Sequence, residues 1–310
     1  MSLLVLPGPV RRVHDALRHK AAVQLRDHVA GEDATRRADS IWGKSGERWF
    51  GPDDPIWRVH LDAAMFVGGL RALLLQSLHP LAMAGVDQHS SYREDPWGRL
   101  QLTSNFVSTT TFGTIPDAER LLARVRGIHR RVHGTYEGVT YRADDPHLLA
   151  WVHAAEVDSF LTCFQAFGGG TLTDAEADTY VAQIGSVSMR LGFEDAPTSV
   201  AALRDTLDAF RPELRGTAEA RSAAHFIVWK PPLALTARPA YLSLVAGAVG
   251  TLPTYARQLL GFRTPPGGAA ALRRIGTVGA AGVRWMLSDP RIQADRRVNQ
   301  AAEAVRNDRP

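Results

Sequence analysis

The sequence predicts an all-α protein built as a single multi-helix domain over residues 1–310. Along most of the chain, apolar residues recur with the spacing that is typical of an α-helix. Strand-like alternation is scarce, and residues that favour helix starts precede several of the periodic segments. Hydrophobic residues make up 45% and charged residues 22% of the chain, which is enough apolar material for a large core. We expect helical packing that is globin-like in the broad sense of the term.

The expected helices begin and end at recognisable residues. Pro55 suits the first turn of a helix, where its missing amide needs no partner. Thr173 and Glu176 have the spacing of a capping box, and Gly134 ends a periodic segment. The run 56–78 is apolar on most sides and therefore predicts a central buried helix. In chain order, we expect helices at residues 9–30, 56–78, 81–91, 96–112, 116–133, 146–167, 174–191, 199–211, 217–229, 238–260, 268–288 and 291–306.

Composition excludes several classes of function. The net charge of +4 is small, no nucleic-acid recognition module is visible, and no nucleic-acid partner is expected. Cys163 is the only cysteine, which excludes an internal disulfide and a cysteine-based metal site. The apolar run 241–252 is shorter than the roughly 20 residues of a membrane-spanning helix, so we expect no integral membrane segment. The N-terminus lacks the order of a secretory signal, and arginine exceeds lysine as in GC-rich bacterial genomes. A cytoplasmic bacterial protein is expected.

The segment "RLLARVRGIHRRVHGT" combines five arginines with two histidines. Placed on a helical wheel, His129 falls within the apolar face that includes Ile128, and His133 falls at its border beside Arg126. We therefore expect His129 to face the core and His133 to lie at the rim. The apolar face of this helix is expected to consist of Leu121, Leu122, Val125, Ile128 and Val132, with Arg120, Arg130 and Arg131 facing solvent.

Polar residues also point inward on two neighbouring helices. His153 and Glu156 fall on the apolar face of helix 146–167, and Arg99 and Thr103 share a face with apolar residues of helix 96–112. His79 directly follows the central helix. Each of these residues, taken singly, also fits a hydrogen-bonded core position. Because inward polar groups recur on three successive helices, they favour a buried cofactor pocket.

Several familiar chemistries do not fit these residues. A zinc site on His129 and His133 would have arginines where HExxH has its glutamate. A di-iron centre needs Glu-x-x-His pairs, whereas the chain has His153-x-x-Glu156 in reverse order. The sequence "HLD" at 60–62 matches only part of a non-haem iron triad. Neither a G-x-S-x-G elbow nor a phosphate-binding glycine loop occurs.

Haem fits better, because its iron accepts a single histidine in an apolar pocket. Its propionates are anionic and favour nearby guanidinium groups. His129 beside Arg126, on an arginine-rich helix, supplies both parts. Any helical protein can offer one such pair, so the spacing alone does not decide the cofactor.

Four longer segments carry a resemblance to a family. They are "LLLQSLHPLAMAGVDQHS" (73–90), "DPWGRLQLTSNFVSTTTFGT" (95–114), "RVRGIHRRVHG" (124–134) and "YRADDPHLLAWVH" (141–153). Together they resemble the bacterial oxygenases grouped with latex-clearing protein and the MpaB oxygenase of mycophenolic acid biosynthesis, over roughly residues 40–260.

This resemblance implies an all-α fold that holds one haem b and cleaves carbon–carbon double bonds of isoprenoid chains with dioxygen. Arg126 to His129 resembles the Arg-x-x-His motif of the latex-clearing branch, which implies that His129 is the iron ligand. Arg99 and Thr103 match an arginine and a threonine that lie by the haem in that branch. Leu102 stands where that branch has a lysine, so polyisoprene is not the expected substrate.

The resulting expectation is a haem-dependent oxygenase that uses dioxygen and a small apolar, unsaturated, isoprenoid-like substrate, with an electron donor as a further partner. His79 and His153 are candidates for the distal pocket, and His153 is the alternative axial ligand. Two other hypotheses remain open. One is a non-catalytic helical protein that binds haem or lipid, and the other is a metal-free structural protein. The sequence does not indicate the oligomeric state.

Overall fold

The computed structural model describes residues 8–31 and 34–291, and this part of the chain confirms the all-α prediction. The helices are α1 Gly8–Ala30, α2 Ala34–Trp42, α3 Pro55–Leu61, α4 Ala64–Gln76, α5 Pro80–His89, α6 Pro96–Phe112, α7 Ile115–His129, α8 Pro146–Phe167, α9 Asp174–Leu191, α10 Val200–Phe210, α11 Ala218–Trp229, α12 Arg238–Thr251, α13 Thr254–Leu259 and α14 Gly268–Leu287. A 3-10 turn, η1 (Arg211–Glu213), separates α10 from α11, and the strands β1 (His133–Tyr136) and β2 (Val139–Arg142) form a hairpin. The helix expected at 291–306 lies outside the described residues.

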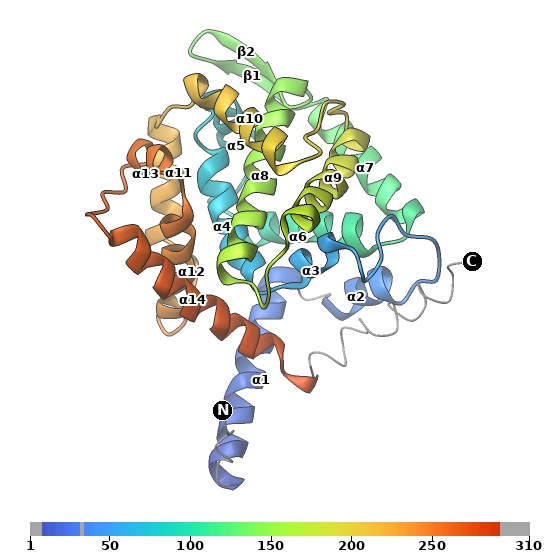
Figure 1. The fold of residues 1–310 in the computed structure, drawn as a ribbon, viewed down its shortest axis with the longest axis vertical. Coiled ribbons are helices and arrows are strands. Elements are labelled where there is room, and N and C mark those ends of the chain that lie inside the picture. Colours follow the sequence, from blue (N-terminus) through green and yellow to red (C-terminus); the bar gives the residue numbers. More distant parts are fainter. Residues whose placement is uncertain (1–7, 32–33, 292–310) are drawn as a thin grey trace.

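Helix α8 runs through the centre of the molecule, with α4 on one side and α9 on the other (Figure 1). Two hydrophobic cores meet at α8. One joins it to α4, α12 and α14, and the other joins it to α3, α6 and α9. Trp151 of α8 is completely buried in the first core and Tyr180 of α9 in the second. The second core positions the candidate site.

The pair α12 and α14 packs unusually closely beside α4. The two helices touch at Gly247 and Gly276, where a Cβ on Gly276 would lie only 2.3 Å from the Cα of Gly247. No side chain fits between two backbones at that distance, so this crossing requires glycine.

The central helix expected over 56–78 is instead two helices, α3 and α4, bent by 88°. Asp62 explains the break. Its carboxylate accepts hydrogen bonds from the backbone amides of Ala64 and Gly169 and from the guanidinium of Arg284. The three hydrogen bonds that Asp62 accepts stabilise the chain more than an uninterrupted helix would. Two of their donors come from distant parts of the chain.

Other differences from the expected boundaries are local. The helix expected over 116–133 ends at His129, and His133 begins β1. Glu137 (φ 50°) and Gly138 (φ 81°) form the two-residue turn between β1 and β2, since both adopt the left-handed conformation that this turn requires. The helix expected over 238–260 breaks at Pro253, and α2 was not expected. The capping box of Thr173 and Glu176 is confirmed.

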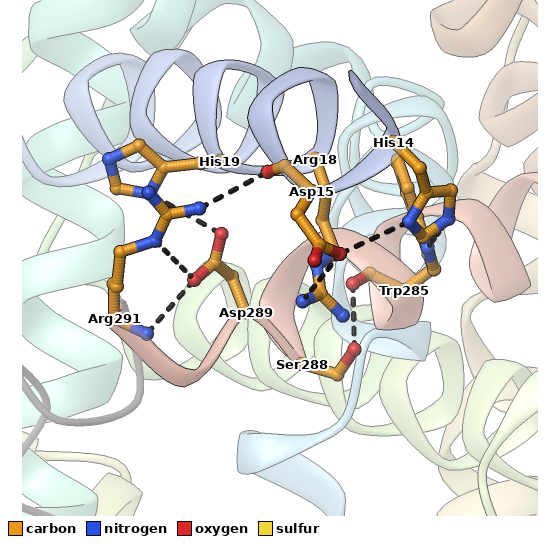
Figure 2. A network of polar contacts seen from close by, with 8 residues as sticks. All are labelled: His14, Asp15, Arg18, His19, Trp285, Ser288, Asp289 and Arg291. Carbon is orange, nitrogen blue, oxygen red and sulfur yellow. Dashed lines mark hydrogen bonds and ion pairs between the residues drawn. The ribbon is translucent and has the colours of Figure 1, made fainter. Parts of the chain in front are cut away.

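The ends of the described chain are tied together by the network in Figure 2. Asp289, just beyond α14, is completely buried and accepts a hydrogen bond from the backbone amide of Arg291 at 2.9 Å. Nδ1 of His19 in α1 lies 3.3 Å from its carboxylate. Trp285 of α14 donates its indole N–H to His14 of α1 at 3.2 Å. These contacts attach α1 to the C-terminal end of α14.

Among the described residues, no single helix is both long and apolar enough to cross a membrane. The bent pair α3 and α4 passes the same length and composition test when its two helices are taken together.

Candidate functional site

One face of α6 organises the candidate site. The helix starts at Asp95, whose carboxylate accepts the amide of Gly98 at 2.9 Å, and Pro96 fills the first helical position. From this start, Arg99, Thr103 and Thr110 fall at helical spacing on one side, together with Phe106 and Val107. We call the part of this face near the start of α6 its outer end and the part near the cavity its inner end. The outer end carries Arg99 and Thr103, and the inner end carries Phe106, Val107 and Thr110.

His129 is the last residue of α7 and is partly buried. Burial lowers the pKa of its imidazole, and the positive charge of Arg99 lowers it further, while Asp144 acts in the opposite direction. The ring is therefore neutral at pH 7, which is the form that binds a metal. No other described residue forms a hydrogen bond with either ring nitrogen of His129. The structure thus brings His129 near Arg99 and leaves its imidazole available.

Arg99 is accessible to solvent, yet the surrounding protein desolvates its guanidinium enough to lower its pKa. Thr103 lies one turn along, exposed, and donates its hydroxyl to the carbonyl of Arg99 at 3.1 Å. Arg99 and Thr103 share one face of α6 as predicted, but the prediction that they point inward is wrong, because both residues are exposed at this end of the helix.

Arg126 points toward α9. Its Nη1 donates to the carbonyl of Arg190 in the last turn of that helix, which joins α7 to α9. Within the described part of the chain Arg126 makes no other hydrogen bond or ion pair, so its remaining guanidinium N–H groups can bind an anion. The prediction that Ile128 packs inward with His129 is wrong, because 43% of Ile128 is exposed.

A small cavity lies beneath the inner end of the α6 face. Its volume is about 30 Å³, enough for one or two water molecules or one dioxygen. Pockets that hold a ligand as large as haem measure several hundred Å³, so this cavity accommodates none. Side chains of α3, α6, α8 and α9 line it, namely Ile56, His60, Phe106, Val107, Thr110, Thr111, His153, Glu156, Ile184, Val187 and Ser188.

The titratable groups of this cavity are neutral at pH 7 or close to neutrality. Burial raises the pKa of Glu156 to about 7 and lowers that of His153 to about 4 and that of His60 to about 3. Glu156 therefore carries a proton in a substantial part of the molecules at pH 7, whereas both histidines are deprotonated. An enclosed carboxylic acid of this kind can hold or release a proton near neutral pH.

Hydrogen bonds fix the orientation of both cavity histidines. Nδ1 of His153 lies 2.6 Å from the hydroxyl of Ser188, while its Nε2 is buried without a partner among the described residues. Nδ1 of His60 lies 2.7 Å from the hydroxyl of Thr111, and its Nε2 lies 3.3 Å from the hydroxyl of Tyr180. His153 is buried and lines the cavity, in agreement with the prediction that it points inward. His60, Thr111 and Tyr180 were not predicted, because nothing in the local sequence shows that α3, α6 and α9 converge.

His79 belongs to a different cluster. Its Nε2 lies 3.2 Å from Glu213, and its ring packs against His147, Trp151 and Phe210. A haem-pocket role for His79 remains a prediction that these contacts do not favour.

The "HLD" residues do not form one site. His60 faces the cavity, whereas Asp62 binds Arg284 and the amide of Gly169. His133 is exposed in β1, as expected for a rim residue, and Arg120, Arg130 and Arg131 are exposed as predicted.

Comparison with known proteins addresses the identity of this site. No curated protein and no solved structure matches the chain. A family model described as the catalytic domain of ER-bound oxygenase mpaB/B' and rubber oxygenase matches residues 57–281, most of the described chain. That range contains α6, His129 and the cavity residues His60, His153 and Glu156. The chain therefore belongs to the mpaB/rubber oxygenase catalytic-domain family and is an enzyme of the oxygenase class, as its motifs predicted.

Proposed function

We propose that the protein is a haem b-dependent oxygenase that acts with dioxygen on a small apolar, unsaturated substrate of isoprenoid-like chemistry. The observation that carries the proposal is His129, a partly buried neutral imidazole with a free ring nitrogen beside Arg99. Membership of an oxygenase family supports the reaction class.

The residues present fit haem b. His129 would ligate the iron, since a neutral imidazole supplies the lone pair that iron requires. Haem bound there would supply the activation of dioxygen. Arg99 and the free N–H groups of Arg126 would bind the propionates, because guanidinium–carboxylate pairs are strong and directional. The desolvation that lowers the pKa of Arg99 strengthens such a pair, because less water competes for the anion.

The inner end of the site suits proton handling. Glu156, with its pKa raised to about 7, would hold a proton at its carboxyl group, while His153 and His60 stay neutral. Thr103 would orient a polar oxygen at the outer end, because its hydroxyl oxygen can still accept a hydrogen bond while it donates to Arg99. His153 is the alternative ligand, because its Nε2 is buried without a hydrogen-bond partner among the described residues.

Apolar surface around the outer end supports an apolar substrate. Leu102 is 68% exposed on α6 and Ile128 is 43% exposed on α7, next to His129 in sequence. A ligand that covered both side chains would remove this apolar surface from water, which favours an apolar partner. Leu102 occupies the position at which the latex-clearing branch has a lysine, so no amine reaches the site from there.

An absorption spectrum of protein produced with haem supplied tests the proposal. We expect a Soret band in the wild type and in His153→Ala, and its loss in His129→Ala. His133→Ala, an exposed histidine four residues further along, is the matched control and should keep the band. If His153→Ala loses the band and His129→Ala keeps it, His153 is the iron ligand and our assignment of His129 is refuted. Oxygen uptake with a panel of terpenoid alkenes then distinguishes turnover from binding alone.

A further inference from the structure

Two histidines and one glutamate from three separate elements meet at a second place on the protein. His79 precedes α5, His147 lies in the first turn of α8, and Glu213 ends η1. One ligand atom from each lies within 4.8 Å of the other two. Nε2 of His79 is 3.2 Å and Nε2 of His147 is 2.9 Å from Oε2 of Glu213. The cluster lies outside the face of α6 on which the oxygenase proposal depends.

These separations are close to those of a metal coordination shell. Zinc binds imidazole nitrogen and carboxylate oxygen at about 2.0–2.2 Å, which places tetrahedral ligand atoms about 3.4 Å apart. Oε2 of Glu213 would have to move away from the two imidazole nitrogens by only a few tenths of an ångström. Two imidazoles with one carboxylate favour zinc, cobalt or nickel over magnesium or calcium, which prefer oxygen ligands alone.

The fold holds the ligands in place before any ion binds. The side chain of His79 is only 3% exposed, and its Nδ1 is buried without a hydrogen-bond partner in the described chain. The polar contact of this ring is therefore directed through Nε2 into the cluster. Phe210 packs against both imidazoles, with ring centroids 4.5 Å from His147 and 6.1 Å from His79.

The backbone also fixes the loop that carries Glu213. The amide of Arg215 donates to the carbonyl of Leu78 at 2.8 Å, so the segment after η1 is attached to the residue before His79. Pre-organisation of this kind lowers the entropic cost of assembling a site.

The open side of the cluster provides access. The side chains of His147 and Glu213 are 56% and 40% exposed, so an ion can enter from solvent and keep a water as its fourth ligand. We propose that His79, His147 and Glu213 form a binding site for one divalent ion of the zinc type, which clamps α5, α8 and η1 together. This site is separate from the haem site proposed above.

Isothermal titration of tag-free, chelator-treated protein with zinc chloride tests this proposal. We expect one equivalent to bind, with cobalt giving the visible absorption of a low-symmetry site. His147→Ala and Glu213→Gln should weaken zinc binding by at least about 10-fold, because each removes a ligand. Both residues are exposed, so these variants are expected to fold. The control His225→Ala, an exposed histidine on α11, should bind as the wild type does.

Thermal melting supplies an independent readout. Zinc should raise the melting temperature of the wild type and of His225→Ala, and should leave that of His147→Ala unchanged, because only an intact site binds the folded state. His129→Ala should retain zinc binding even though it loses haem. Absence of zinc binding in the wild type, or unchanged affinity in both His147→Ala and Glu213→Gln, would show that the cluster is only a hydrogen-bonded triad. Loss of zinc binding in His129→Ala would overturn the separation of the two sites.

Discussion

The enclosed carboxyl group of Glu156 makes the stability of this protein depend on pH in a particular way. In the unfolded chain the group ionises near the ordinary pKa of 4.5, whereas in the folded protein burial keeps the proton on it up to about pH 7. Between these values the folded state binds more protons, so the free energy of unfolding falls as pH rises. The difference corresponds to about 3 kcal/mol, at about 1.4 kcal/mol for each pH unit.

Glu156→Gln removes this dependence, because glutamine has nearly the same shape and stays neutral. At pH 4.5 the variant and the wild type should have similar stability. At pH 8 the variant should be more stable by up to about 3 kcal/mol, since the wild type must then bury a charge. His60 and His153 do not change charge between pH 5 and 8, because burial lowers the pKa of each to 4 or below.

Urea unfolding followed by circular dichroism at pH 5, 6, 7 and 8 measures this difference directly. Titration of other groups cancels when the variant is compared with the wild type at each pH. Glu119→Gln is the matched control, since Glu119 is exposed on α7, and its effect should be the same at all four values. A Glu156→Gln effect that does not change with pH would refute the reasoning.

Two further substitutions test the packing. Gly276→Ala should destabilise the protein by about 1–3 kcal/mol, because its methyl group meets the backbone of Gly247. The control Gly282→Ala, on the same helix, has open space and should stabilise the protein by about 0.5–1 kcal/mol. Equal effects of the two substitutions in thermal unfolding would contradict the close crossing of α12 and α14. Arg71→Met should destabilise by about 3 kcal/mol, since Arg71 is only 3% exposed and lies 2.7 Å from Asp158. The control Arg58→Ala breaks the exposed ion pair with Glu176 and should lower the free energy of unfolding by less than about 1 kcal/mol. Similar losses of stability for Arg71→Met and Arg58→Ala in urea unfolding would contradict this prediction.

Helix positions could be predicted from the sequence wherever local chemistry decides them. Pro55 and the capping box of Thr173 and Glu176 start helices where expected, because their effects act within one turn. The break at Asp62 could not be predicted, since the donors that compensate it include Arg284 and Gly169, which are remote in sequence. Local propensity contains no information about such partners.

The same distinction holds for the candidate site. Arg99 and Thr103 share a face because helical spacing requires it, and the inward direction of His153 and Glu156 was predicted in the same way. His60 joins the cavity only because α3 turns away from α4, and that turn depends on Asp62. Likewise, the cluster of His79 needs Glu213, which lies 134 residues further along the chain.

The order of charges along α6 has a consequence for any ligand that lies on this face. Its outer end carries the permanent positive charge of Arg99, whereas the inner end holds Glu156 and two histidines that are neutral or nearly so. An amphipathic ligand therefore gains electrostatic energy when its anionic edge points outward, and it avoids burying a charge when its apolar part points inward. If haem binds His129 as we propose, the same rule directs its propionates toward the arginines. The small cavity beside the proton of Glu156 is then left for dioxygen.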